Sequence, residues 1–326
     1  SLISLWAHLQ PEIVFDETVA EKGLDGYRAL IMADCDVLTE SVAAKVKQFQ
    51  AAGGIVIGDE RLAPAIKPDI VLTAYERTGK AKEDKAALMA LAAELREKLD
   101  ASYRPYVDTT NRDVIPYLRR YKDTDYVFVV NDHREYGDYV GHHGRVMENG
   151  LPSEATVAVR RPAGFVYDLL GRMPMNAREQ NGHLLADIAL GPCDGGLYMI
   201  TGRPIAKVAI SGPESIERGK SGKCLIGVLD VAGKPIDAVV PVEVTIRTSA
   251  GDTAEFSGYY GAADGQVEIP LDVAINDPIG VWQIEARELA SGRTAVHNVR
   301  VPGPSPWPPK AKPMSGDAAN PVQPRG

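Results

Sequence analysis

The sequence is poor in cysteine and has fewer basic than acidic residues. Its three cysteines, Cys35, Cys193 and Cys224, lie far apart, so they form neither a CxxC metal motif nor an even set of disulfide partners. Three reduced, mostly buried thiols are predicted, and one disulfide with a free third thiol is the alternative. The formal net charge of -8 argues against nucleic acid and anionic membrane surfaces as main partners.

Long apolar runs and cofactor motifs are also missing. No run of about 18 apolar residues occurs, so a membrane-spanning segment is not expected. The sequence contains neither a GxxxxGK[ST] loop nor a GxGxxG after a strand, so no cofactor is expected. The first residue is Ser1 and no signal peptide follows, which leads us to expect a fragment of a longer polypeptide. With 326 residues, 44% of them hydrophobic, two or three domains are expected.

The stretch Gly26–Arg61 predicts one β-α-β step of a parallel sheet. Tyr27–Met32 is an apolar run of strand length, and Thr39 is a good cap for the helix that follows it. Gly53-Gly54 ends that helix, and Ile55–Ile57 begins the next buried strand. Residues near the amino terminus are therefore expected to form an α/β domain.

Other elements of this region have simpler signals. Glu12–Phe15 and Ile70–Leu72 are strand candidates, and Lys82–Leu99 is rich in strong helix formers with one apolar stripe. We place the α/β domain at residues 1–105. A connector with a short helix over Asp113–Arg120 is expected to follow.

Beyond the connector, short β-prone runs alternate with Gly and Pro, as in antiparallel sandwiches. In residues 106–204 the strand candidates are Tyr126–Val130, Ala155–Val159, Gly164–Asp168, His183–Leu190 and Gly196–Ile200. Residues 205–302 contain seven strand candidates, the count of an immunoglobulin-like sandwich, without the Cys…Trp…Cys framework of antibody domains. Residues 303–326 are rich in Pro and polar residues and are expected to be a disordered tail.

Three patterns resemble parts of multidomain glycoside hydrolases. Leu24–Glu60 resembles the amidotransferase-like domain that follows the catalytic barrel in β-galactosidases. Tyr126–Asn131 (YVFVVN) with Phe165–Gly171 (FVYDLLG) resembles the small sandwiches at the carboxyl end of many glycosidases. Val208–Val301 is similar to extracellular immunoglobulin- or macroglobulin-like modules. The resemblance implies an amino-terminal flavodoxin-like, class I amidotransferase-like domain with a parallel sheet, then two antiparallel, immunoglobulin-like β-sandwich domains.

The resemblance also implies a role. In such glycosidases two carboxylates act from a barrel that would precede Ser1, so no catalytic residue is expected in this chain. The amidotransferase-like fold has a catalytic thiol near its second strand, where this sequence reads Gly58-Asp59-Glu60-Arg61, without Cys or Ser. A non-catalytic part of a secreted, periplasmic or cell-surface carbohydrate-active enzyme is implied. Its partners would be carbohydrate, the upstream catalytic domain and further copies of itself.

A surface-displayed binding or adhesion module without a hydrolase parent is the rival interpretation. A third is a stand-alone amidotransferase-like hydrolase that uses Cys35. Aspartates flank Cys35 on both sides, and nearby carboxylates raise a thiol's pKa and weaken it as a nucleophile. We therefore expect Cys35 to be a structural residue.

Two groups of residues are candidate ligand contacts. Asp59, Glu60 and Arg61 follow a predicted parallel strand at its carboxyl end, where open α/β sheets bind ligands. A local pair between the arginine and a carboxylate is the favoured interpretation of this group, and an interdomain contact is a third. Tyr136 and Tyr139 have rings suited to stacking on the apolar face of a sugar.

Both tyrosines belong to the polar stretch Asn131–Gly144, which we interpret as a loop. Its histidines, His133, His142 and His143, lie near acidic residues but not at a recognisable ligand spacing, so no metal site is predicted. An ordinary solvated loop is the favoured interpretation, and a sugar-binding loop is the alternative.

Overall fold

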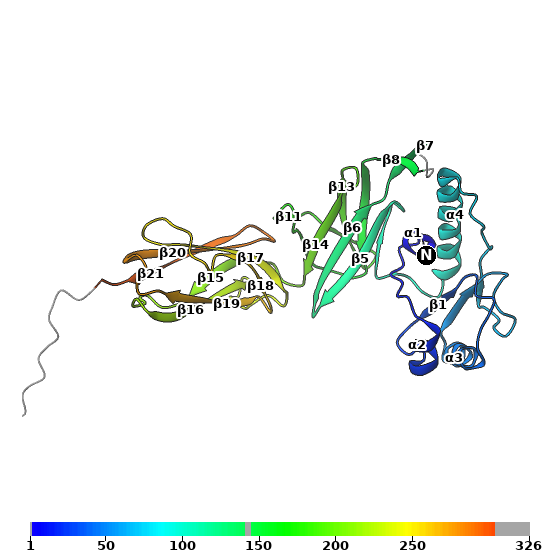
Figure 1. The fold of residues 1–326 in the computed structure, drawn as a ribbon, viewed down its shortest axis with the longest axis horizontal. Helices are drawn as coiled ribbons and strands as arrows, with labels where there is room; N and C mark the ends of the chain where they lie inside the picture. The colour runs from blue at the N-terminus through cyan, green and yellow to red at the C-terminus, as the bar shows by residue number, and fades with distance from the viewer. Residues whose placement is uncertain (1, 141–144, 304–326) are drawn as a thin grey trace, which may run out of the picture.

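The computed structural model describes residues 2–140 and 145–303, and it is elongated (Figure 1). An α/β part at the amino-terminal end is followed along the long axis by two groups of antiparallel sheets. The expectation of α/β structure followed by β-sandwich-like sheets is therefore confirmed. The domain boundaries and the flavodoxin-like and immunoglobulin-like assignments stay predictions.

A three-stranded parallel sheet forms the centre of the α/β part. Its strands, in spatial order, are β1 (Ala29–Met32), β2 (Ile55–Gly58) and β3 (Ile70–Val71). Helices cover both faces: α2 (Asp16–Lys22) and α3 (Glu40–Ala51) on one, α1 (Leu2–Trp6) and α4 (Ala81–Leu99) on the other. Side chains alternate between the two faces, as a strand requires. Leu30 packs with α3, whereas Ala29 and Ile31 pack with α1 and α4.

The predicted ends of α3 are confirmed in atomic detail. The Thr39 Oγ1 accepts a hydrogen bond from the Val42 backbone N–H at 3.4 Å, which satisfies one free donor of the first turn. Gly53 has a φ of +92°, a left-handed conformation that favours glycine. A Cβ on Gly54 would lie 2.3 Å from the Phe49 ring, so the chain can turn back into β2 only without one.

Three predicted elements are wrong. Glu12–Phe15 is not a strand, because no neighbouring strand pairs with it among the described residues. Asp113–Arg120 is not helical but lies largely in β5 (Val114–Tyr121), which pairs along its full length with β6 (Thr124–Asn131). β5 is an edge strand of its sheet, so Pro116 is tolerated there.

The third correction concerns the supposed loop Asn131–Gly144. Most of its described residues belong to β7 (Arg134–Val140), which forms a hairpin with β8 (Arg145–Gly150). Polar residues dominate this hairpin because it is a two-stranded ribbon outside the sandwich cores. The periodicity expected of a half-buried strand is therefore weak in its sequence.

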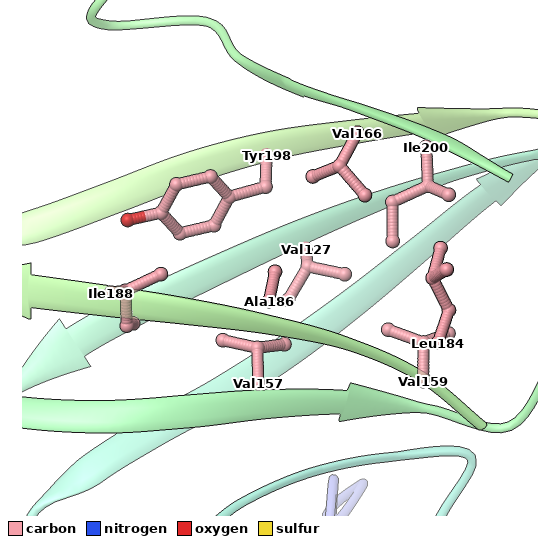
Figure 2. A pocket seen from close by; sticks show the side chains of 9 residues that line it. All are labelled: Val127, Val157, Val159, Val166, Leu184, Ala186, Ile188, Tyr198 and Ile200. Atoms are coloured by element: carbon pink, nitrogen blue, oxygen red, sulfur yellow. The ribbon is translucent and has the colours of Figure 1, made fainter. Parts of the chain in front are cut away.

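The middle part of the chain is a pair of antiparallel sheets. One sheet has the order β11 (Met173–Met175), β10 (Phe165–Asp168), β14 (Gly195–Thr201), β6, β5. The other has the order β12 (Arg178–Gln180), β13 (His183–Leu190), β9 (Ser153–Val159), β4 (Val107–Thr109). Figure 2 shows apolar side chains from both sheets pointing into the space between them. Only about 10 Å³ stays empty there, so this interior is a packed core.

Seven strands form the last part of the chain, close to the seven predicted ranges. The first sheet is β15 (Lys207–Ser211), β16 (Lys220–Leu229), β19 (Gln266–Val273), and the second is β18 (Gly258–Ala262), β17 (Val240–Arg247), β20 (Gly280–Glu288), β21 (Thr294–Val301). Trp282 is buried in the core between them.

Polar side chains join the α/β part to the middle sandwich. The Trp6 Nε1 donates to the Asp132 Oδ2 at 3.0 Å. The buried His8 lies with its Nδ1 2.6 Å from the Asp108 Oδ1, and the Arg96 Nη2 donates to the Asp108 Oδ2 at 2.7 Å. Asp108 on β4 is therefore held by two residues of the α/β part.

This contact predicts an acid-sensitive junction. Burial would raise the pKa of Asp108, but hydrogen bonds from His8 and Arg96 and the charge of Arg96 outweigh it and lower that pKa to about 2. Because the folded-state pKa lies below the unfolded value of about 3.9, the contribution is complete above that value and is lost as pH falls towards 2. We expect a loss of about 1–2 kcal/mol of unfolding free energy between pH 5 and pH 2, since solvent screens part of the effect.

Urea unfolding between pH 5 and pH 2 would measure this loss of unfolding free energy. The Asp108→Asn variant, which has no carboxylate at this position, should lose that part of the pH dependence. Identical pH profiles for the two proteins would contradict the prediction.

Candidate functional site

The carboxyl ends of β1 and β2 open onto a small cavity of about 130 Å³. Apolar side chains of the sheet and of α4 line its inner part, and Asp34, Asp59 and Arg61 line its polar part. The structure thus places Asp59 and Arg61 where the sequence indicated. Glu60 lies beside them and accepts a hydrogen bond from the Ala74 N–H at 2.7 Å, but it does not line the cavity.

Most of the polar atoms at this cavity are already engaged with one another. The Asp59 Oδ2 accepts from the Asp34 N–H at 2.9 Å, and its Oδ1 accepts from the Arg61 N–H at 3.1 Å. The Arg61 guanidinium pairs with Asp34 at 3.2 Å and with Glu76. These hydrogen bonds and charges raise the pKa of Arg61. The arrangement fixes two turns against each other, and ligand binding by Asp59, Glu60 or Arg61 stays a prediction.

Cys35 follows Asp34 in the chain, and its surroundings disfavour a thiolate. Burial and then the negative charges of Asp16, Asp59, Asp34 and Asp36 raise the pKa of the Cys35 thiol. Its Sγ lies 3.6 Å from the carbonyl oxygen of Ala33. These surroundings weaken Cys35 as a nucleophile, which argues against the amidotransferase-like hydrolase.

Tyr136 lies on β7 and is not among the residues that line the cavity. Its ring faces the Arg134 guanidinium, whose central carbon is 5.7 Å from the ring centroid. The backbone of Tyr139 pairs with Val146 on β8. The structure therefore does not bring Tyr136 together with Asp59, and sugar stacking by Tyr136 or Tyr139 stays a prediction.

The histidines of the same stretch do not assemble into a metal site in the described part of the chain. The His133 Nδ1 lies 3.0 Å from the carbonyl oxygen of Pro152, while His142 and His143 lie outside the described residues. No group of three His, Cys, Asp or Glu residues with metal-binding geometry occurs in residues 2–140 and 145–303.

A second candidate surface was missed by the sequence analysis. On the outer face of the five-stranded sheet, Tyr117 of β5 lies directly opposite Phe128 of β6, and Phe128 lies directly opposite Leu197 of β14. Tyr117 and Phe128 are each 40% exposed, and Val130 beside them is exposed as well. Directly opposite side chains on paired strands lie about 5 Å apart at Cβ, so the two rings form one continuous apolar patch.

The surroundings of this aromatic patch are flat and partly polar. Gly195, opposite Val130 on the same face, has no side chain to rise above the rings. The Arg119 guanidinium lies 4.6 Å from the Tyr117 ring centroid. Such a patch suits a planar apolar ligand with polar edges.

A sequence signal for this patch existed in YVFVV (Tyr126–Val130). In a strand, Tyr126, Phe128 and Val130 share one face and Val127 and Val129 share the other. Because both faces carry apolar residues, the run reads as fully buried, and alternation could not reveal that one face is open. Tyr117 was hidden by the helix prediction for its segment.

No protein-family model matches the sequence, and no curated protein matches it. Among solved structures, the chain is similar to an α-L-fucosidase from Paenibacillus thiaminolyticus, with a TM-score of 0.44, 13% identity and coverage of 61% of this chain and 44% of that one. It is also similar to an exo-carrageenase of family GH42 from Bacteroides ovatus, with a TM-score of 0.35, 15% identity, and coverage of 61% and 26%.

A third similar structure is the adhesin InvE of Yersinia pseudotuberculosis, with a TM-score of 0.25, 11% identity, and coverage of 55% and 54%. The chain spans less than half the length of the two glycosidases. Each TM-score lies below 0.5, so the function proposed for this chain rests on its own residues. No helix among the described residues is long and apolar enough to cross a membrane.

Proposed function

We propose that this chain is the non-catalytic part of a secreted glycoside hydrolase of the β-galactosidase-like kind. The exposed pair Tyr117 and Phe128 carries the proposal, because two neighbouring, partly exposed rings on one sheet face suit stacking against the apolar faces of sugar rings. The sequence resemblance of the α/β part to a glycosidase accessory domain supports the same function. The catalytic carboxylates belong to another part of the polypeptide.

In this proposal each part has its own role. The amidotransferase-like domain, residues 1–105, packs against the catalytic barrel or against another copy of the chain. The sandwich at residues 106–204 holds the glycan on its aromatic patch. The immunoglobulin-like sandwich at residues 205–302 extends the assembly away from the α/β part.

Glycan binding by the 326-residue chain tests the carbohydrate part of the proposal. We expect an array of neutral oligosaccharides to show saturable binding. The Tyr117→Ala and Phe128→Ala variants should each weaken the best ligand about tenfold in calorimetry, since each removes one stacking face. Tyr259→Ala is a matched control, because Tyr259 is an exposed tyrosine on β18, in the last part of the chain. A blank array, or equal losses in all three variants, would refute glycan binding at this patch.

Activity of the complete polypeptide tests the enzymatic part. The full open reading frame should yield a protein that hydrolyses aryl β-galactosides or related aryl glycosides, while the 326-residue chain should not. Hydrolysis by the short chain, or none by the complete protein on any aryl glycoside, would count against the proposal.

A surface-displayed carbohydrate- or protein-binding module is the second candidate. The aromatic patch favours it equally, because the patch lies wholly within this chain and needs no catalytic partner. Glycan binding together with a reading frame that encodes no hydrolase domain would establish this alternative.

A further inference from the structure

The parallel sheet has an open edge along its first strand. β1 pairs with β2, and β2 in turn with β3, so β1 stands at the edge of the described sheet. The Ile55 N–H donates to the Arg28 carbonyl at 3.1 Å, and Ala29 is the register partner of Ile55. In a parallel ladder, Arg28 and Leu30 therefore face β2, while the backbone groups of Ala29 and Ile31 point outward. The edge presents free donors and acceptors to an incoming strand.

A groove of about 510 Å³ runs along this edge. One wall is Gly26–Ile31, which covers the approach to β1 and most of β1, and the other is the segment Leu9–Val14. Apolar side chains of the α/β part contribute to it, including Leu24, Ile57 and Leu99. The groove thus joins an unpaired strand edge to an apolar interior.

The second wall of the groove contains residues typical of a strand, but they pair with no other strand in the described part of the chain. Glu12–Phe15 (EIVF) is β-prone, yet it joins no sheet in the described structure, and Ile13 and Phe15 are 79% and 66% exposed. The Glu12 carboxylate raises the pKa of Tyr27, so this wall lies close to the segment that leads into β1. A strand lying between the two walls would give both β1 and Glu12–Phe15 a backbone partner.

We propose that this groove receives an extended apolar strand from the polypeptide that leads into α1, and that this strand completes the sheet between β1 and Glu12–Phe15. The proposal rests on the proposed function, in which this chain is part of a longer enzyme. Ser4 of α1 lines the groove, so a segment leading into α1 starts beside it. The strand runs parallel to β1, since α1 packs on one face of the sheet as a crossover helix does.

The chemistry of the incoming segment follows from its surroundings. Helices cover both faces of the sheet at β1, so a strand beside it is buried on both sides. Such strands read as continuous runs of Val, Ile and Leu. A segment of about β1's length, four residues, matches the edge that β1 offers.

Amide hydrogen exchange on two forms of the protein tests the proposal. The first form is the 326-residue chain, and the second adds the residues that the gene encodes before Ser1. In the second form we expect the Ala29 and Ile31 amides to exchange about 100-fold more slowly, because a new strand takes their hydrogen bonds. The Val56 amide in the middle strand should exchange alike in both.

A proline variant sharpens the test. Ala29→Pro removes an outward N–H without touching the β1–β2 ladder, so the short chain should tolerate it. In the longer form it should abolish the added protection of Ile31, whereas the matched Ala29→Val variant should keep it. The comparison of the two wild-type forms stands by itself if the proline variant does not fold.

Equal exchange of Ala29 and Ile31 in the two forms would overturn the proposal. The proposal would also be overturned if the Ala29 and Ile31 amides of the 326-residue chain became protected only when it dimerises. In that case a second copy of the chain would occupy the groove. Because hydrolysis of aryl glycosides is measured separately, an active enzyme with an unprotected β1 refutes this inference alone.

Discussion

Replacing Asp125 with alanine is expected to lower the unfolding free energy of the middle sandwich by about 3–5 kcal/mol. The Asp125 side chain is fully buried at the start of β6. Its oxygens accept hydrogen bonds from the Arg161 Nη1 and the Arg120 Nε, both at 2.8 Å, and from the Tyr106 hydroxyl at 3.2 Å. Removing the carboxylate takes away the close, buried partner of the Arg161 guanidinium and leaves it only the largely exposed Asp123 at 3.7 Å, and a poorly compensated buried charge is costly.

Asp187→Ala is the matched control for this prediction. Asp187 also pairs with an arginine, Arg178, through two hydrogen bonds, but both side chains are largely exposed. Water solvates the freed groups there, so the unfolding midpoint should stay close to that of the unchanged protein. Urea unfolding followed by circular dichroism would measure both variants. Similar midpoints for the two would show that burial of the Asp125 pair is not what stabilises this sandwich.

Glu288→Ala is expected to destabilise the last part of the chain by about 3 kcal/mol. Glu288 is fully buried at the end of β20 and accepts hydrogen bonds in the turn that leads to β21. The donors are the backbone N–H groups of Ala290, Ser291 and Arg293, at 2.8–3.1 Å, and the Ser291 hydroxyl. Alanine would leave this set of donors without an acceptor, and buried unsatisfied donors are costly.

Two further variants separate charge from position. Glu288→Gln keeps the shape of the side chain but replaces one acceptor oxygen with an NH2 group, which faces N–H donors that it cannot accept from. We therefore expect it to lower the unfolding free energy measurably, but by less than Glu288→Ala does. Glu285→Ala, at an exposed position on the same strand, should leave the midpoint nearly unchanged. Thermal unfolding of the three variants would test this order. A Glu285→Ala effect as large as that of Glu288→Ala would contradict it.

The elements that the sequence predicted best carry their own local signals. Thr39 and Gly53-Gly54 mark both ends of α3 through a side-chain cap and a left-handed turn, and neither depends on distant residues. The alternation in Gly280–Arg287 likewise identifies β20, with Trp282 and Ile284 facing the core. Short-range stereochemistry and periodicity are sufficient for such elements.

The failures occurred where the presence or absence of a pairing strand decides the conformation. Glu12–Phe15 has strand-forming residues, but a strand needs an edge to pair with, and the described structure offers it none. Asp113–Arg120 became part of β5 because β6 was available as a hairpin partner.

The candidate site divides in the same way. Asp59 and Arg61 were located from the sequence, because the carboxyl end of a parallel strand can be found from the β-α-β pattern. Their partners Asp34 and Glu76 come from other loops, and only the folded sheet brings them together. The aromatic patch of Tyr117 and Phe128 depends on the register of two strands, and on which sheet face stays uncovered by the rest of the molecule.

Local residue chemistry was thus sufficient for the ends of α3, for most strands and for the turn that carries Asp59 and Arg61. The order of strands in each sheet, the exposure of Tyr117 and Phe128, and the open edge of β1 depend on which segments pack together in the folded chain. Those contacts are set by the burial of whole faces, and no short window of sequence records which face of a strand another element will cover.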